Sequence, residues 1–248
     1  MNNLNREEYS MALEGWIMAK QDIKRIAELF PPNYVFNLSP EQVQWLKKNN
    51  SNKEFCVEIG VIKGQLAIIL CPLDEKGTKV AVGEFPYCTF EALENDLKLT
   101  EVQTYTVVKN ALLSKDMRKI DNDSDMFFPI TSQPIMEQDK AVNSIESWQS
   151  NGQDWFYAQY KEDKARTIFN KFYVPSEKIC HADADLSFVC SFGLKYSEIY
   201  QKQLPALIFI AFHKNLGNGG SLETISNTYD YAKPCPPICK IPDLGTDE

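Results

Sequence analysis

The sequence predicts an α+β protein in which antiparallel strands carry peripheral helices and the two halves of the chain are pseudo-symmetric relatives. Apolar stripes at helical spacing occur near the start and the middle of the chain, and short β-rich runs alternate with turn residues. Blocks of the first half also recur, in the same order, in the second. We expect a first half over 1–128 and a second half over 135–248, packed as one unit with a C-terminal tail that contains proline and cysteine.

The first half opens with helix signals. Residues 5–30 carry apolar side chains at spacings of three, four and seven, and two prolines end this stripe. A short strand is expected over 33–38. Ser39 as N-cap, a proline at the first helical position and Gln42 three residues after the cap then predict a second helix with a capping box.

The following segments are rich in β-forming residues. Residues 54–61 and 65–73 flank a Lys-Gly turn, which predicts a hairpin, and 78–85 is expected to add a third strand. Segment 100–108 alternates like a strand but also has a helix start signal, and we favour the helix. The polar and proline-bearing segment 119–134 is expected to connect the halves.

The second half is expected to contain helices and then strands, ending in a loop. The predicted elements are a helix over 139–150 ended by Asn-Gly, a short helix over 155–161, strands over 166–174, 186–194 and 206–213, and a loop-rich tail from Gly217 onward.

Internal repeats support the idea of two related halves. The repeated blocks are Leu13–Trp16 and Ile145–Trp148 (132 positions apart), Phe36–Val43 and Phe172–Ile179 (136 apart), Phe55–Val61 and Phe188–Leu194 (133 apart), and, more weakly, Ala67–Leu70 and Leu207–Ile210 (140 apart). The last offset implies a seven-residue insertion between 196 and 203. We favour duplication over chance likeness between ordinary amphipathic elements. We expect Gly60 and Gly193 to lie where the chain bends or where the backbone of a neighbour approaches closely.

Composition and charge exclude several classes of function. The net charge of −8 and the scattered lysines and arginines argue against a nucleic-acid partner. The longest apolar run, 204–212, is too short to span a bilayer, and the N-terminal residues do not resemble a signal peptide. The seven cysteines lie mostly in apolar contexts, as expected of reduced thiols in a cytoplasmic protein.

The C-terminal tail poses a separate question, because Cys235 and Cys239 flank a Pro-Pro-Ile spacer. In an extended polyproline conformation their Cα atoms lie roughly 12 Å apart, whereas a disulfide tolerates about 7 Å at most. We therefore favour reduced thiols on a stiff tail. A disulfide or redox pair requires a tight turn at the prolines, for which a cis bond is one route. A metal site lacks a second pair of ligands, with His181 as the remaining candidate.

Few other residues are candidates for chemistry. His181, Asp183 and Asp185 alternate and could hold a divalent ion, and Cys190 is a candidate catalytic residue, although a surface loop and a core strand explain these positions equally well. Aspartates at 121, 123 and 125 begin like a calcium loop, which then lacks its glycine and its final glutamate.

We favour a non-catalytic binding or interaction protein whose ligand is a protein or peptide, bound at exposed aromatic side chains or sheet edges. The alternative is a metal-dependent hydrolase with its site between the two halves. The sequence predicts no cofactor, and it leaves catalysis and oligomeric state open.

Overall fold

The computed structural model describes residues 1–93, 140–176, 179, 188–211 and 233–239 with their side chains, and the backbone alone in the remaining parts of the elements below. The helices are α1 (Arg6–Ala19), α2 (Ile23–Leu29), α3 (Pro40–Asn49) and α4 (Gln138–Asp163). The strands are β1 (Asn3–Leu4), β2 (Tyr34–Leu38), β3 (Glu54–Ile62), β4 (Gln65–Cys71), β5 (Phe85–Ala92), β6 (Tyr105–Val108), β7 (Leu112–Leu113), β8 (Lys119–Ile120), β9 (Met126–Pro129), β10 (Lys171–Pro175), β11 (Ser187–Ser197), β12 (Lys202–Leu216), β13 (Leu222–Asp230) and β14 (Lys233–Cys235).

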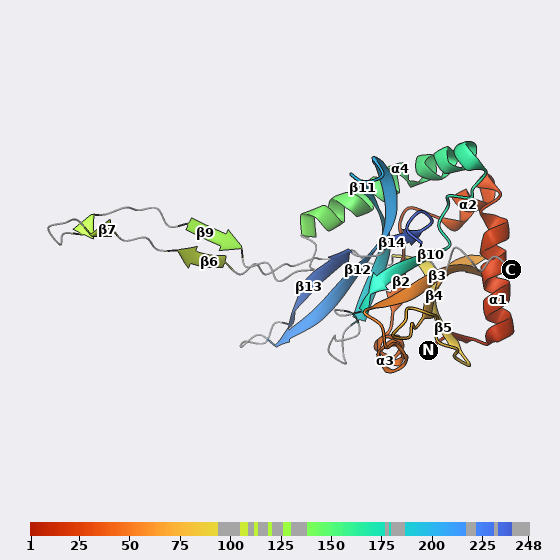
Figure 1. The fold of residues 1–248 in the computed structure, drawn as a ribbon, viewed down its shortest axis with the longest axis horizontal. Coiled ribbons are helices and arrows are strands. Elements are labelled where there is room, and N and C mark those ends of the chain that lie inside the picture. Colours follow the sequence, from red (N-terminus) through yellow and green to blue (C-terminus); the bar gives the residue numbers. More distant parts are fainter. Residues whose placement is uncertain are drawn as a thin grey trace.

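One large antiparallel sheet organises these elements. Its strand order is β13-β12-β11-β2-β5-β4-β3-β10-β14, with β1 added to β5, and β6–β9 and β7–β8 form separate pairs. The sheet curves until β14 approaches β12, so that it is nearly closed. In Figure 1, α1 runs along one side of the body and α4 crosses another, where they pack on β3 and β11. The predicted α+β class with an antiparallel sheet and peripheral helices is confirmed.

The first-half strands β2, β5, β4 and β3 lie side by side in this sheet, and strands of the second half flank them on both sides. β2 pairs with β11 of the second half, and β3 pairs with β10. Phe188 lies opposite Leu38, and Phe55 lies opposite Val174. Leu38 and Val174 occupy the same place in one repeated block. Phe55 and Phe188 occupy the same place in another. Each pairing therefore joins equivalent positions of the two blocks, so the two pairings have the same register. This match supports the duplication, which itself stays a prediction.

The glycines at 60 and 193 lie beneath helices in both halves. A Cβ on Gly60 would lie 3.1 Å from the Cβ of Ala12 in α1, and a Cβ on Gly193 would lie 3.3 Å from the Cβ of Ser144 in α4. At Gly60 the expected backbone approach is confirmed, because the carbonyl oxygen of Ala12 would lie 3.3 Å from the added Cβ. At Gly193 the three nearest atoms belong to side chains, with Ile208 Cδ1 closest at 2.6 Å.

The strand register corrects the weakest of the repeated blocks. Gly60 pairs with Ala67, and Gly193 pairs with Ala206, so six residues separate the first pair and twelve the second. Ala67 thus corresponds to Ala206, and the insertion in the second hairpin has six residues instead of the seven predicted.

The main hydrophobic core combines aromatic side chains from both halves. Phe30, at the end of α2, has ring contacts with aromatic residues of both halves. These are Trp16 and Phe90 in the first half and Trp148, Phe156, Phe169 and Phe192 in the second. The indole Nε1–H of Trp16 donates to the carbonyl oxygen of Phe169 at 2.9 Å. This shared core makes the described parts of the two halves one packing unit.

Two helix predictions were wrong in their bounds. The continuous helix over 5–30 is interrupted between α1 and α2, because the side chain of Asp22 accepts a hydrogen bond from the backbone of Lys24 and starts α2 afresh. The predicted stop at 151–152 does not occur, and α4 continues to Asp163. Gly152 instead lies against the ring of Trp148, where a Cβ would be 3.1 Å from the ring carbons.

Several strand predictions also need correction. Residues 78–84 form a single bridge, from Lys79 to Leu73, and the strand begins at Phe85, because this segment crosses the outer face of the sheet and packs Val82 there. Segment 105–108 is the strand β6, paired with β9, rather than part of a helix. The tail contains β13 and β14, whose backbones pair with strands of the large sheet.

Candidate functional site

The residues proposed for chemistry from the sequence do not come together in one described site. Cys190 is fully buried in β11, where burial raises the pKa of its thiol well above the usual value. A buried neutral thiol of this kind is a poor nucleophile. His181, Asp183 and Asp185 lie outside the described residues, as do the aspartates at 121, 123 and 125.

The cysteines of the tail form a disulfide. Cys235 and Cys239 are bonded, with their Cα atoms 4.8 Å apart, and the bonds before Pro236 and Pro237 are both cis. The preferred prediction of reduced thiols was therefore wrong, because the spacer is not extended and its two ends lie within disulfide distance. This bond also removes both sulfurs as metal ligands. The other described cysteines (Cys56, Cys71, Cys88 and Cys190) are buried and form no disulfide, as predicted.

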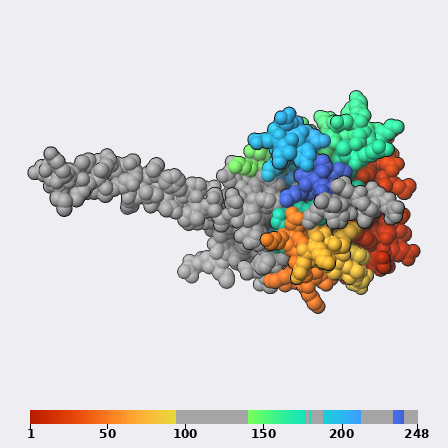
Figure 2. Space-filling view, viewed as in Figure 1, coloured from red at the N-terminus to blue at the C-terminus, as the bar shows by residue number. Residues whose placement is uncertain are grey.

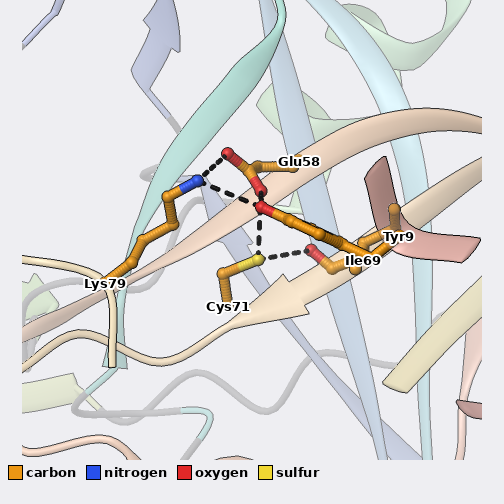
Figure 3. A network of polar contacts seen from close by, with 5 residues as sticks. All are labelled: Tyr9, Glu58, Ile69, Cys71 and Lys79. Atoms are coloured by element: carbon orange, nitrogen blue, oxygen red, sulfur yellow. Dashed lines mark hydrogen bonds and ion pairs between the residues drawn. The ribbon is translucent and has the colours of Figure 1, made fainter. Parts of the chain in front are cut away.

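A polar network lies on the outer face of the sheet, around the carboxylate of Glu58 (Figure 3). Alternation along β3 points Glu58 toward α1, where only 6% of the residue is exposed. Its carboxylate accepts hydrogen bonds from the Tyr9 hydroxyl, from Lys79 Nζ at 2.8 Å and from Cys71 Sγ at 3.2 Å. Lys79 Nζ also donates to the Tyr9 hydroxyl at 3.0 Å.

The protonation states of this network follow from burial and from one ion pair. Burial alone would raise the pKa of Glu58, but the charge and hydrogen bond of Lys79 outweigh it and lower that pKa. Burial raises the pKa of the Tyr9 hydroxyl and of the Cys71 thiol, and the negative charge of Glu58 adds to both shifts. At neutral pH, Glu58 is therefore a carboxylate, Lys79 an ammonium, and Tyr9 and Cys71 neutral donors.

The network acts as a structural clamp. Every oxygen of Glu58 is engaged by a donor, and the Cys71 thiol stays protonated, so neither is a free base or nucleophile. Tyr9 also stacks on Phe85 with ring centroids 4.0 Å apart. The contacts thus fix α1 and the 78–84 segment to the middle of β3. The sequence contains a signal for this network, a lone glutamate inside an apolar strand, which our sequence reading missed.

The corresponding place in the second half is mostly apolar. The two halves can be aligned on Gly60 with Gly193, on the helix residues above these glycines, and on the strand residues paired with them. In this alignment Tyr9, Glu58 and Cys71 correspond to Ala141, Ser191 and Ile210. Ala141 and Ile210 are buried in an apolar cluster beneath α4. The clamp therefore belongs to the first half alone.

A polar cavity of about 300 Å³ opens where β2, α3 and β5 diverge. Its lining includes the carboxylates of Glu41 and Glu91 and the side chains of Asn37, Ser39 and Thr89. Gln42 is buried at its base, donates to the carbonyl oxygen of Tyr87 at 2.8 Å and accepts from the backbone N–H of Ser39 at 2.9 Å. The expected capping box of α3 is thus present and also anchors this helix to β5.

The cavity lining combines two carboxylates with neutral polar groups. Burial raises the pKa of the Cys88 thiol to about 12, so this lining residue stays neutral. Among the described residues, no lysine, arginine or histidine lines the cavity. Nor do three His, Cys, Asp or Glu side chains gather around a possible metal position in the part of the chain with described side chains.

The β11–β12 hairpin carries an exposed apolar tip. Ile199 is 89% exposed, Tyr196 57% and Tyr200 41%. These residues lie in or beside the inserted segment that makes this hairpin longer than β3–β4. The indole N–H of Trp155 in α4 donates to the carbonyl oxygen of Gln203 at 3.0 Å, which ties the base of the tip to the helix. In Figure 2, the light-blue hairpin stands out from the body at the top of the view.

Comparisons with known proteins give no relative: no family model, curated protein or solved structure matches the chain. No described helix is long and apolar enough to cross a membrane.

Proposed function

We propose that the protein is a non-catalytic binding protein that recognises another protein or a peptide through the tip of the β11–β12 hairpin. The exposure of Tyr196, Ile199 and Tyr200 carries this proposal. These side chains add little to the core, and a group of exposed large apolar residues on a protruding element is typical of an interaction surface. Tyrosine in particular gives large contact area with few rotatable bonds.

The setting of the tip supports this role. The antiparallel pairing of β11 and β12 extends to Ser197 and Lys202, next to the turn. Together with the contact from Trp155, this pairing holds the tip in a defined position and lowers the entropic cost of binding. The net charge of −8 argues against a nucleic-acid ligand. No observation on the described residues favours the hydrolase alternative.

Affinity capture with matched variants tests the proposal. A triple variant (Tyr196→Ser, Ile199→Ser, Tyr200→Ser) removes the apolar tip, and Tyr157→Ser removes a tyrosine on α4 that is 50% exposed. Proteins retained by the wild type and the Tyr157 variant, but lost by the triple variant, are then purified and titrated against all three. We expect at least roughly tenfold weaker binding by the triple variant alone, as for loss of an interface hot spot.

The folding of the triple variant is checked before binding is measured. Because the three side chains are exposed, we expect its urea midpoint to match that of the wild type. Equal capture by all three proteins, or capture by none, would overturn the proposal.

We also propose a cytoplasmic location. The four buried free thiols fit a reducing compartment, whereas a disulfide such as Cys235–Cys239 is rare there. Fractionation of cells that produce the chain tests this, and recovery in a secreted or oxidising fraction would refute it.

A further inference from the structure

We infer that the Cys235–Cys239 disulfide is a reversible thiol–disulfide site whose reduction releases β14 from the edge of the sheet. This device is independent of the hairpin tip, and it acts on the place where the sheet nearly closes. β14 pairs with β10 and approaches β12, so that it bridges the gap between them.

Few backbone contacts hold this short strand. β14 has three residues, and its middle residue, Pro234, has no N–H to donate. Beyond the strand pairing, the Asn170 N–H donates to the Cys235 carbonyl oxygen at 2.8 Å, and the Ile238 N–H donates to the Pro234 carbonyl oxygen at 2.8 Å within the tail. Lys233 Nζ also forms an exposed ion pair of 3.4 Å with Glu54. An exposed ion pair of this kind contributes little.

The Cys235–Cys239 disulfide adds a covalent constraint to this weakly held strand. It closes a turn over four sequence positions and keeps Cys235 buried and Cys239 packed on the same outer apolar cluster as Tyr173. A cross-link limits the conformations of the released segment, so its removal favours release. Cys239 is only partly buried, which leaves a sulfur accessible to a small thiol.

The chemical step is a two-electron exchange. A thiolate of a small dithiol attacks one sulfur, and the S–S bond of the protein breaks as a mixed disulfide forms. The second thiol of the reductant displaces the protein sulfur and closes a cyclic disulfide. The protein gains two electrons and two protons and is left with two thiols. Release of β14 then opens one edge of β10.

Hydrogen exchange and thiol counting test this inference on the full chain, with dithiothreitol as the probe. Under native conditions, reduction should add two alkylatable thiols, at Cys235 and Cys239. The Asn170 amide should then exchange roughly ten- to thirtyfold faster, as expected for removal of a short cross-link. Amides of the β11–β12 ladder should keep their rates.

A double variant, Cys235→Ser with Cys239→Ser, serves as the matched control. It should show fast exchange at Asn170 without reductant, and no further change with it. The inference is overturned if the purified protein already has both thiols free, if native reduction adds no thiols, or if two thiols appear while exchange at Asn170 stays slow.

Discussion

Phe30 lies at the centre of the aromatic core and contacts rings from both halves of the chain. Phe30→Ala should therefore lower the free energy of unfolding by about 3–5 kcal/mol, through lost burial and the cavity left behind. Met18→Ala serves as a control, because Met18 is 73% exposed and should change stability little. Urea unfolding measures both, and similar values for the two variants would contradict the central place of Phe30.

Glu58 is the residue on which the outer clamp depends. Glu58→Gln leaves the ammonium of Lys79 without its counter-charge and should cost about 1–3 kcal/mol. The double variant, Glu58→Gln with Lys79→Met, should recover part of that loss, because no charge is then left unpaired. Strictly additive losses in urea unfolding would show that the two side chains do not interact.

The same ion pair predicts a pH dependence. The folded-state pKa of Glu58 is below its usual 4.5, so its stabilising contribution is present above that pH and is lost as the pH falls through the folded value. The pKa of Lys79 is raised above 10.5, so its contribution is lost only as the pH rises beyond that range. As the pH falls below about 4.5, the wild type should lose more stability than Glu58→Gln. Parallel pH curves from urea titrations would refute this.

The sequence context of single residues predicted whether they are buried better than it predicted which residues they contact. The apolar contexts of Cys56, Cys71 and Cys190 indicated core thiols, which the structure confirms. The bond between Cys235 and Cys239 was not predictable, because the conformation of the two intervening prolines decides whether the sulfurs meet. The partners of Glu58 come from α1, β4 and a loop, and only the fold brings them together.

At the scale of elements, the packing of α1 on β3 depends on Gly60. An added Cβ would lie 3.1 Å from the Cβ of Ala12 and 3.0 Å from Ile69 Cδ1, so Gly60→Ala should shift the helix and cost about 1–3 kcal/mol. Gly83→Ala is the matched control, because no atom lies within 4 Å of its added Cβ. Thermal unfolding should separate the two variants. Equal melting temperatures would mean that α1 does not pack as described.

Elements with complete local signals were predictable. The capping box of α3 and the β3–β4 hairpin formed as expected, the latter with Lys63 and Gly64 both at positive φ in its turn. Elements whose bounds depend on contacts with other parts of the fold were not predictable from the sequence. The Asn-Gly pair within α4 is a common stop signal, but Trp148 packs against Gly152 within the continuing helix. The segment before β5 has the composition of a strand, yet it forms a single bridge, between Lys79 and Leu73, while the side chain of Lys79 reaches Glu58.

At the scale of the molecule, the pairing of second-half strands on both sides of the first-half strands, together with the shared core, predicts one cooperative unit. Since β2 pairs with β11 and β3 with β10, unfolding of the second half would expose both edges of the four-stranded first-half block and half of the shared aromatic core. Far-UV and near-UV circular dichroism should give coincident urea transitions, and the calorimetric and van't Hoff enthalpies should agree. Two separated transitions would contradict a shared core.

The repeated blocks anticipated this arrangement but not its detail. Matching register at the two cross-half pairings supports duplication, while the extra length of the β11–β12 hairpin and the clamp at Glu58 distinguish the halves. The sequence repeats identify the segments that resemble each other. The strand pairing is needed to determine the length and position of the insertion in the β11–β12 hairpin. The proposed binding function rests on this difference between the halves.

Site-specific photo-crosslinking tests that function most directly. A benzophenone amino acid is introduced at position 199, in the tip, or at position 157, on α4, both of which are exposed. Irradiation of cells that produce each protein should give a discrete adduct from position 199 and none of the same mass from position 157. The same adducts from both positions, or none from position 199, would contradict the account.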